Sequence, residues 1–289
     1  MNSIRFGINI DPSAELVQDA FQLARLADDL RLDLITIQDH PYNRRFLDTW
    51  TLLTALATHT QQVRVATNVA NLPLRPPAML AKMAATLDVL TGGRVELGLG
   101  AGIFWQGVEA YGGEARTPGE AYIAFEEALH ILRGFWDQAG GTFDYEGTIY
   151  QVKGARPGPA PAHRIPIWTG AIGPRMLRLT GRMADGVLVS RPYVPPGKLP
   201  ALNAAIDDGA VRAGRDPSEI RRGYNVMGAI RPVEASTKDE MIGPVAYWVD
   251  ELARLHQEHR VDTFLFWPVG GREREQIEVF AQEIIPAVR

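Results

Sequence analysis

An acid and a base stand side by side directly after a short apolar segment. Residues 34–38 are typical of a buried strand, and Asp39 and His40 follow without a break. Histidine is the side chain best suited to moving a proton near neutral pH, and a neighbouring carboxylate can tune its ring. We therefore expect proton transfer at a strand end. Two structural interpretations stay open, in which Asp39 caps a turn and His40, pushed toward extended geometry by Pro41, is a structural histidine.

Glycine and aromatic residues follow other apolar segments in the same way. Bare backbone amides at such turns can bind phosphate or carbonyl oxygens, especially at a helix N-terminus. The two glycine-rich turns are Gly98–Gly102, at the end of residues 94–99, and Gly170–Gly173, after residues 167–169. Tryptophans at three predicted strand ends can line a flat aromatic pocket or fill the core, and they are Trp105, Trp168 and Trp267.

The composition excludes several classes of protein. The chain has 289 residues, a net charge of -4 and no cysteine, so the basic surface of a nucleic-acid binder, disulfides and thiolate chemistry are not expected. No two of the six histidines have metal-ligand spacing, and His256 and His259 are expected on a solvated helix face. We find no apolar run of the ~18 residues that a membrane span needs and no signal-peptide pattern, and we expect a cytoplasmic protein.

Strand-like and helix-like segments alternate along the chain in eight units. The strands are short and apolar on both faces, which is typical of parallel strands buried under helices. Eight such units in one domain of residues 1–289 favour an α/β fold of the (β/α)8 TIM barrel type over an open doubly wound sheet, for which no G-x-G-x-x-G turn is present. The expected strands are residues 4–10, 34–38, 63–68, 94–99, 167–169, 186–190, 224–230 and 263–267.

One region interrupts this alternation. Residues 140–166 contain the segment GTFDYEGTIYQV, which is typical of a hairpin with its turn at Glu146-Gly147, and a proline-rich connection follows it. We expect this insertion before the fifth strand to form a lid or flap near the rim of the barrel. Because a barrel places its active site at the C-terminal ends of its strands, Asp39, His40 and both glycine turns are expected on that rim.

Long stretches of the sequence resemble the bacterial luciferase-like flavin- and deazaflavin-dependent oxidoreductases, which are TIM barrels. The resemblance covers nearly the whole chain and is carried by four segments, QDHPYNRRFLDTWTLLTALATHT, VRVATNVANLPLRPPAMLAKMAATLDVLTGGRVELGLGAG, YGGEARTPGEA and IWTGAIGPRMLRLTGRMADGVLVS. The surroundings of Asp39 and His40 are most similar to the deazaflavin branch, which includes a tetrahydromethanopterin reductase, secondary alcohol dehydrogenases and a sugar-phosphate dehydrogenase.

The resemblance implies roles for particular positions. The residue matching Asp39 contacts the cofactor ring, the one matching His40 lies beside the reacting ring carbon, and those matching Asn68-Val69 carry a non-prolyl cis peptide that supports the ring. The sugar-phosphate dehydrogenases place a catalytic glutamate where this chain has Ile103, which speaks against a sugar-phosphate substrate. Backbone at two turns would hold the phosphate or the chain leading to it, at Gly100, Ala101 and Gly102 and at Gly170, Ala171, Ile172 and Gly173.

The resemblance implies an oxidoreductase that transfers a hydride between a 5-deazaflavin coenzyme (F420) and a small organic substrate, and the residues agree with this mechanism. The coenzyme carries the hydride, while His40 takes or gives the proton and Asp39 fixes the ring or tunes the imidazole. The loop around Phe104 and the insertion at residues 140–166 would choose the substrate. We also expect a homodimer. The expected substrate pocket contains Tyr42, Phe104, Trp105, Trp168 and Trp267.

Two alternatives stay open. One is an FMN-dependent monooxygenase, in which reduced flavin reacts with oxygen, and the other is a flavin-binding protein without turnover. FMN ends in a dianionic phosphate that proteins usually meet with concentrated positive charge, whereas neither glycine turn contains an arginine. Arg44, Arg45 and Arg75 lie in nearby loops, where they would suit the oligoglutamyl tail of the deazaflavin coenzyme or be simple surface charge.

Overall fold

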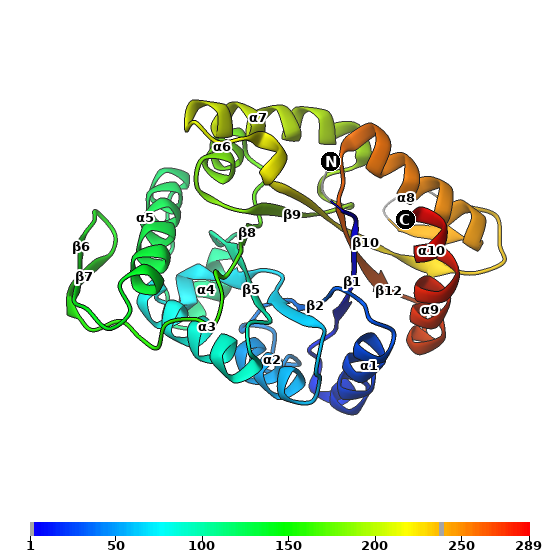
Figure 1. Ribbon diagram of the computed structural model, residues 1–289, viewed down its shortest axis with the longest axis horizontal. Helices are drawn as coiled ribbons and strands as arrows, with labels where there is room; N and C mark the ends of the chain where they lie inside the picture. The colour runs from blue at the N-terminus through cyan, green and yellow to red at the C-terminus, as the bar shows by residue number, and fades with distance from the viewer. Residues whose placement is uncertain (1–2, 237–239) are drawn as a thin grey trace.

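The computed structural model describes residues 3–236 and 240–289. Eight parallel strands close into one barrel, because β1 pairs with both β2 and β12 and the ring is completed where β9 pairs with β10 (Figure 1). The expected (β/α)8 fold is confirmed. In ring order the strands are β1 (Arg5–Ile10), β2 (Leu34–Ile37), β3 (Arg64–Thr67), β5 (Val95–Gly100), β8 (Ile167–Thr169), β9 (Gly186–Ser190), β10 (Arg221–Ile230) and β12 (Thr263–Pro268).

Helices surround the barrel on the outside of the strands (Figure 1). Local signals set their ends: the Asp48 side chain accepts from the Thr51 amide at the start of α2, and Gly92, with φ of 66°, ends α3. No helix among the described residues is long and apolar enough to cross a membrane. The helices are α1 (Val17–Asp29), α2 (Thr49–Thr58), α3 (Pro77–Thr91), α4 (Trp105–Ala110), α5 (Pro118–Asp137), α6 (Pro174–Met183), α7 (Leu199–Arg212), α8 (Val245–His259), α9 (Glu273–Val279) and α10 (Ile285–Val288).

Several short elements were not expected from the sequence. Strand β4 (Ala70–Asn71) adds to β5, and β11 (Met241–Gly243) adds to β10. The expected closing helix from residue 273 to 288 is interrupted by a π-helical segment, Phe280–Ile284, between α9 and α10. Single-turn 3-10 helices cover Ala14–Leu16, Leu72–Leu74, Pro196–Lys198 and Pro217–Glu219.

The insertion forms the expected hairpin, but the structure corrects its expected position. Strands β6 (Phe143–Glu146) and β7 (Gln151–Ala155) pair in an antiparallel two-stranded sheet that lies outside α5, away from the barrel (Figure 1). The carboxylate of Glu127 on α5 accepts from the amides of Thr148 and Tyr150 in the turn, at 2.5 and 2.8 Å. The hairpin is therefore fastened along the outer face of a helix and does not cover the rim.

A small apolar cluster fills the inside of the barrel. Its buried members are Leu34, Ala66, Trp168, Leu188 and Leu265, and Val69 packs against them. The larger core lies between the strands and the surrounding helices, where Phe264 and Phe266 of β12 are buried. Successive residues of a strand point to opposite faces, so β12 sends Leu265 inward and its two phenylalanines outward.

Candidate functional site

Four neighbouring strands bring most of the expected site residues to one side of the barrel rim. β2, β3, β5 and β8 are consecutive in the sheet. The segments that follow their C-terminal ends are residues 38–42, 68–71, 101–105 and 170–173, in that order. Residues more than a hundred positions apart in the chain therefore meet at one mouth of the barrel, which is where a TIM barrel places its chemistry.

The imidazole of His40 is paired with a phenol. Its Nδ1 atom lies 2.9 Å from the hydroxyl of Tyr42, and the two rings are 5.6 Å apart. The Tyr42 ring in turn packs edge-on against Phe104, from the loop after β5, at 5.1 Å. The structure thus brings together three residues that the sequence placed in the site, and it leaves the Nε2 atom of His40 as the nitrogen not facing Tyr42.

Burial decides the protonation state of this pair. It lowers the pKa of His40 below 6.5, and the negative charge of Asp39 offsets this only in part. Burial, followed by the same charge, raises the pKa of Tyr42 above 10. At neutral pH the pair is therefore a neutral imidazole beside a protonated phenol, a state in which the histidine can accept a proton.

Asp39 is held by the protein itself, and its expected contact with a cofactor stays a prediction. The side chain is 2% exposed, and Arg75 binds both of its oxygens, with Nε at 2.7 Å and Nη2 at 2.8 Å. The amide of Asn71 donates to Oδ2 at 2.8 Å, and Arg75 also reaches Asp48 at 2.6 Å. Asp39 therefore joins the loops after β2 and β3, and it acts on His40 through its charge.

The same contacts correct the expected role of Arg75. Its guanidinium is shared between Asp39 and Asp48, and its side chain is only 12% exposed. Those two carboxylates raise the pKa of Arg75 despite its burial, and Arg75 lowers the pKa of Asp48. Arg75 is therefore committed to structure. Arg44 and Arg45, which are exposed, remain as rim cations for a ligand's anionic tail.

The peptide bond between Asn68 and Val69 is cis, as expected. Three glycines from two neighbouring strand ends surround the Val69 side chain. A Cβ added at Gly98, Gly100 or Gly170 would lie 3.1, 2.7 or 2.8 Å from a Val69 methyl group. Gly100 and Gly170, which were expected to bind phosphate, are therefore needed to make room for Val69, while a Cβ at Gly98 would first meet the carbonyl oxygen of Thr67 at 2.0 Å.

The rest of the two turns stays open for backbone contacts. Gly102 has φ of 93°, which favours glycine, and a Cβ there would meet Pro73 at 2.7 Å and the Trp105 ring at 3.0 Å. Gly173 precedes the ten-residue helix α6, and a Cβ there would meet nothing within 4 Å. Ala101 is half-buried, Ala171 is buried, and Ile172 is 57% exposed. The proposed phosphate contacts at these positions stay predictions.

A hydrogen-bonded polar layer inside the mouth was missed from the sequence. Asn68 donates through Nδ2 to Oδ1 of Asn225 at 2.7 Å and to Oγ1 of Thr36 at 3.2 Å. Thr36 donates to Oδ1 of Asn9 at 3.0 Å, and Asn225 donates to Oγ of Ser190 at 2.9 Å. Thr36 and Ser190 are each the single polar residue of an otherwise apolar strand, and that is a signal that could have found them.

The three tryptophans of the expected pocket lie in different places. Trp105 begins α4 beside Gly102, at the rim. Trp267, near the end of β12, lines a cavity of about 510 Å³ together with Ile10 and with Asn9 of the polar layer. Trp168 is 1% exposed, and its indole Nε1 donates to Glu96 near the N-terminal end of β5, so the structure moves it out of the expected pocket.

Comparisons with known proteins find relatives over most of the chain. The chain is 30% identical to the F420-dependent glucose-6-phosphate dehydrogenase of Microbacterium testaceum, over 88% of this chain and 77% of that protein. It is 34% identical to the 5,10-methylenetetrahydromethanopterin reductase of Methanolobus tindarius, over 74% of this chain but only 62% of that protein. An F420-dependent secondary alcohol dehydrogenase, solved with an F420-acetone adduct, superimposes with a TM-score of 0.90 at 19% identity over the whole of both chains, which shows the shared fold.

The sequence also matches one protein family over almost all of its length. The match covers residues 3–280, and the family is described as luciferase-like monooxygenase. It includes the eight barrel strands and every residue of the rim site. This chain therefore belongs to the luciferase-like monooxygenase family.

Proposed function

We propose that this protein is a deazaflavin-dependent oxidoreductase that transfers a hydride between the F420 coenzyme and a small organic substrate. The observation that carries the proposal is the neutral His40 imidazole, held by Tyr42 at the rim next to the Asn68-Val69 segment. Two-electron chemistry at a carbon–oxygen bond needs a group that moves one proton. The relatives named as F420-dependent enzymes support the same class.

The residues at the rim fit a flat ring with polar edges. Among the described residues, Asn9 Nδ2 and Asn71 Oδ1 are buried polar atoms without a hydrogen-bond partner. A buried polar atom without a partner is destabilising by about 1–3 kcal/mol, and a bound ring could supply the partners of these two atoms. A deazaflavin ring carries both carbonyl acceptors and an N–H donor, and it could satisfy one donor and one acceptor. Asn9 belongs to the polar layer, where its Oδ1 lies 3.5 Å from Nδ2 of Asn68, and Asn71 pairs with Gly100 at the end of β5.

The chain's own part in the reaction is the movement of a proton. When bound, the coenzyme supplies the hydride chemistry. His40 would accept the hydroxyl proton when an alcohol is oxidised and return a proton when a carbonyl is reduced. Because Nδ1 faces Tyr42, Nε2 is the nitrogen that would face the substrate.

Tyr42 would keep His40 ready for either direction. A phenol hydroxyl both donates and accepts, so it can pair with Nδ1 whether or not that nitrogen carries the proton. Burial raises the pKa of Tyr42, so the phenol keeps its own proton. Asp39, fixed by Arg75, would add a stationary negative charge that favours the protonated imidazole.

The walls of the site favour a small uncharged substrate. Ile103 and Phe104 are 76% and 50% exposed, and with Tyr42 and Trp105 they form an apolar edge to the mouth. A sugar phosphate would need polar and cationic partners that these four residues do not supply. We therefore propose a small alcohol or carbonyl compound, although several relatives are named as F420-dependent glucose-6-phosphate dehydrogenases.

The alternative is an FMN-dependent monooxygenase, which the description of the family favours. The rim turns favour the deazaflavin, since residues 100–102 and 170–173 offer amides but no arginine. Amides suit a monoanionic phosphodiester, while a dianionic phosphate is usually met by concentrated charge. The third possibility, a flavin-binding protein without turnover, would be removed by activity with any donor.

One experiment separates these readings. The protein is purified from a host that makes both cofactors, and the absorbance and mass of the bound chromophore are recorded. Loss or gain of the oxidised deazaflavin absorbance is then followed with a panel of small alcohols and ketones. Turnover with F420 supports the proposal, while turnover only with reduced FMN and oxygen would replace it with the monooxygenase.

The expected setting completes the proposal. We propose that the enzyme works in the cytoplasm, in keeping with the absence of cysteine from the sequence, and that it acts as a homodimer. Size-exclusion chromatography with light scattering tests the second statement, and a particle of about 32 kDa would contradict it.

A further inference from the structure

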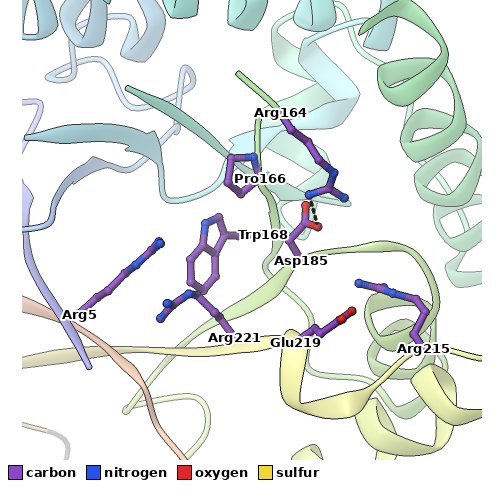
Figure 2. A pocket seen from close by; sticks show the side chains of 8 residues that line it. All are labelled: Arg5, Arg164, Pro166, Trp168, Asp185, Arg215, Glu219 and Arg221. Atoms are coloured by element: carbon purple, nitrogen blue, oxygen red, sulfur yellow. Dashed lines mark ion pairs between the residues drawn. The ribbon is translucent and has the colours of Figure 1, made fainter. Parts of the chain in front are cut away.

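A second cavity opens at the opposite end of the barrel from the candidate site. Its volume is about 370 Å³. Arg5 and Arg221 are the first residues of β1 and β10, Pro166 immediately precedes β8, and Asp185 immediately precedes β9, so this is the N-terminal mouth. Figure 2 shows the charged side chains gathered around the cavity and the Trp168 ring beside them.

Positive charge exceeds negative charge in the lining of this cavity. The charged residues that line it are Arg5, Arg164, Arg215, Arg221, Asp185 and Glu219, which gives a net charge of +2. Their ion-pair partners do not remove the excess. Two acids outside the lining pair with its arginines, Glu96 with Arg5 and Asp262 with Arg221. Two arginines outside the lining pair with acids, Arg133 with Asp185 and Arg64 with Glu96. The two negative and two positive charges cancel, and the net charge stays at +2.

Arg215 supplies the least compensated charge. Its Nη1 atom donates to the backbone oxygens of Gly181 and Ala184, both at 2.8 Å. Within residues 3–236 and 240–289, no carboxylate lies within ion-pair distance of it. Backbone carbonyls fix the position of the guanidinium without neutralising it, and Figure 2 shows its tip turned toward the cavity. A fixed guanidinium with spare donors is well suited to an oxyanion.

Arg221 and Arg5 add to the positive potential from the other side. Arg221 has a side chain only 17% exposed, and it stands 3.6 Å from Asp262. Burial, and after it the positive charge of Arg5, lower the pKa of Arg221. Two guanidiniums thus face the same space, and an anion between them would relieve their repulsion.

We propose that this N-terminal cavity binds a compact dianion, either a phosphate group or a small dicarboxylate. The net charge of +2 matches two negative charges, and guanidinium groups bind both ligand classes through paired hydrogen bonds. The Trp168 indole already donates to Glu96, so it would serve as a wall and not as a donor. The site is independent of the oxidoreductase proposal, because it lies at the other mouth and uses none of the rim residues.

The test is isothermal titration of the full chain with inorganic phosphate, and in parallel with succinate. Sodium chloride of equal ionic strength is the blank. We expect saturable binding of at least one of the two, and the one that binds identifies the ligand class. Heats equal to the chloride blank for both anions would overturn the proposal.

Three variants locate the bound anion. Arg215→Gln should weaken binding by about tenfold or more, because it removes a charge-assisted contact. Glu219→Gln removes an exposed lining carboxylate and should tighten binding about threefold, an effect that loss of folding cannot mimic. Arg212→Gln is the matched control, because Arg212 is 74% exposed, pairs with Asp208 and lies outside the cavity, so affinity should not change.

The pattern of variants separates this cavity from the rim turns. Phosphate held at residues 100–102 or 170–173 would bind equally to wild type, Arg215→Gln and Glu219→Gln. That result would overturn the proposal even though binding was observed. Opposite changes in the two variants, with the control unchanged, would establish the N-terminal site.

Discussion

The Nδ1 atom of His40 lies 2.9 Å from the hydroxyl of Tyr42, two residues further along the same loop. Tyr42 also packs edge-on against Phe104, which belongs to the loop after β5. Tyr42 therefore links His40, the proposed proton carrier, to Phe104 at the apolar edge of the mouth. A change in either loop will alter the position of the imidazole.

His40→Ala should lower turnover by about 100-fold or more, the usual scale for one acid–base group. The affinity for the coenzyme should change far less, because the alanine removes the proton carrier and leaves the surrounding loops in place. Steady-state kinetics and a coenzyme titration measure the two effects. His59→Ala is the control, since His59 is exposed at the end of α2. Normal turnover by His40→Ala on a verified substrate would make His40 a structural residue.

The rate of alcohol oxidation should fall only on the acid side, at a pH below 6.5. Burial lowers the pKa of His40, so the base stays neutral through neutral pH and is protonated as the pH falls through that lowered value. A pH profile of kcat/KM, which reports the free enzyme, measures this limb. Tyr42→Phe keeps the ring contact with Phe104 but removes the hydroxyl, and kcat should fall about tenfold. A limb centred well above pH 6.5 would contradict the assignment.

Arg75→Met should destabilise the fold by about 3 kcal/mol, because it leaves the carboxylate of Asp39 buried without its partner. Denaturant unfolding monitored by fluorescence measures the change. Arg274→Met is the matched control, because the ion pair of Arg274 with Glu278 is exposed, and the midpoint should not move. Equal midpoints for wild type and Arg75→Met would show that Asp39 does not depend on this contact.

Gly100→Ala should destabilise the protein by about 2 kcal/mol, since the added methyl group would overlap Val69. Coenzyme affinity should fall with it. The double variant Gly100→Ala with Val69→Ala should recover much of the stability, because the shortened side chain leaves room. Gly173→Ala, at a position with open space and ordinary φ, should be neutral in stability. A neutral Gly100→Ala would refute the packing role.

The deazaflavin should bind at least tenfold tighter than FMN, a difference of ~1.4 kcal/mol. Fluorescence quenching with both oxidised cofactors measures it. Because Arg75 is committed to Asp39 and Asp48, Arg44 and Arg45 are the remaining candidates for the anionic tail. Replacing both with glutamine should weaken deazaflavin binding, more at low salt than at high salt, and leave FMN unaffected. Equal or tighter FMN binding would move the assignment to the monooxygenase.

The barrel could be predicted from the sequence because its signals are local. Apolar strands and capped helices repeat at regular intervals, and Gly186–Ser190 was expected with its observed bounds. β10 begins three residues earlier than expected, at Arg221. Its first two residues are arginines, and their charge hides a strand that is stabilised by distant acids, Asp207 and Asp262. The two-residue strand β4 has no periodic signal of its own.

The site was predicted in part, and its errors share one cause. His40, Tyr42 and Phe104 were found because each has a distinctive type at a strand end. The commitment of Asp39 to Arg75 and the link from Asn68 to Asn225 join residues 36 and 157 positions apart, and such partners carry no local pattern. Trp168 was misplaced because a three-residue strand gives no indication of the height at which its inward side chain lies.

The apolar cluster inside the barrel has a consequence for traffic through the molecule. Leu34, Ala66, Trp168, Leu188 and Leu265, with Val69 above them, stop the barrel along its axis. Reactant and product must therefore enter and leave at the C-terminal end of the barrel, where residues 101–105 and 170–173 lie, and each turnover has to release product there before the next substrate molecule binds. Redesign for larger substrates should accordingly begin with these two loops. Smaller side chains in the apolar cluster would open no second route without also removing the residues against which Val69 packs.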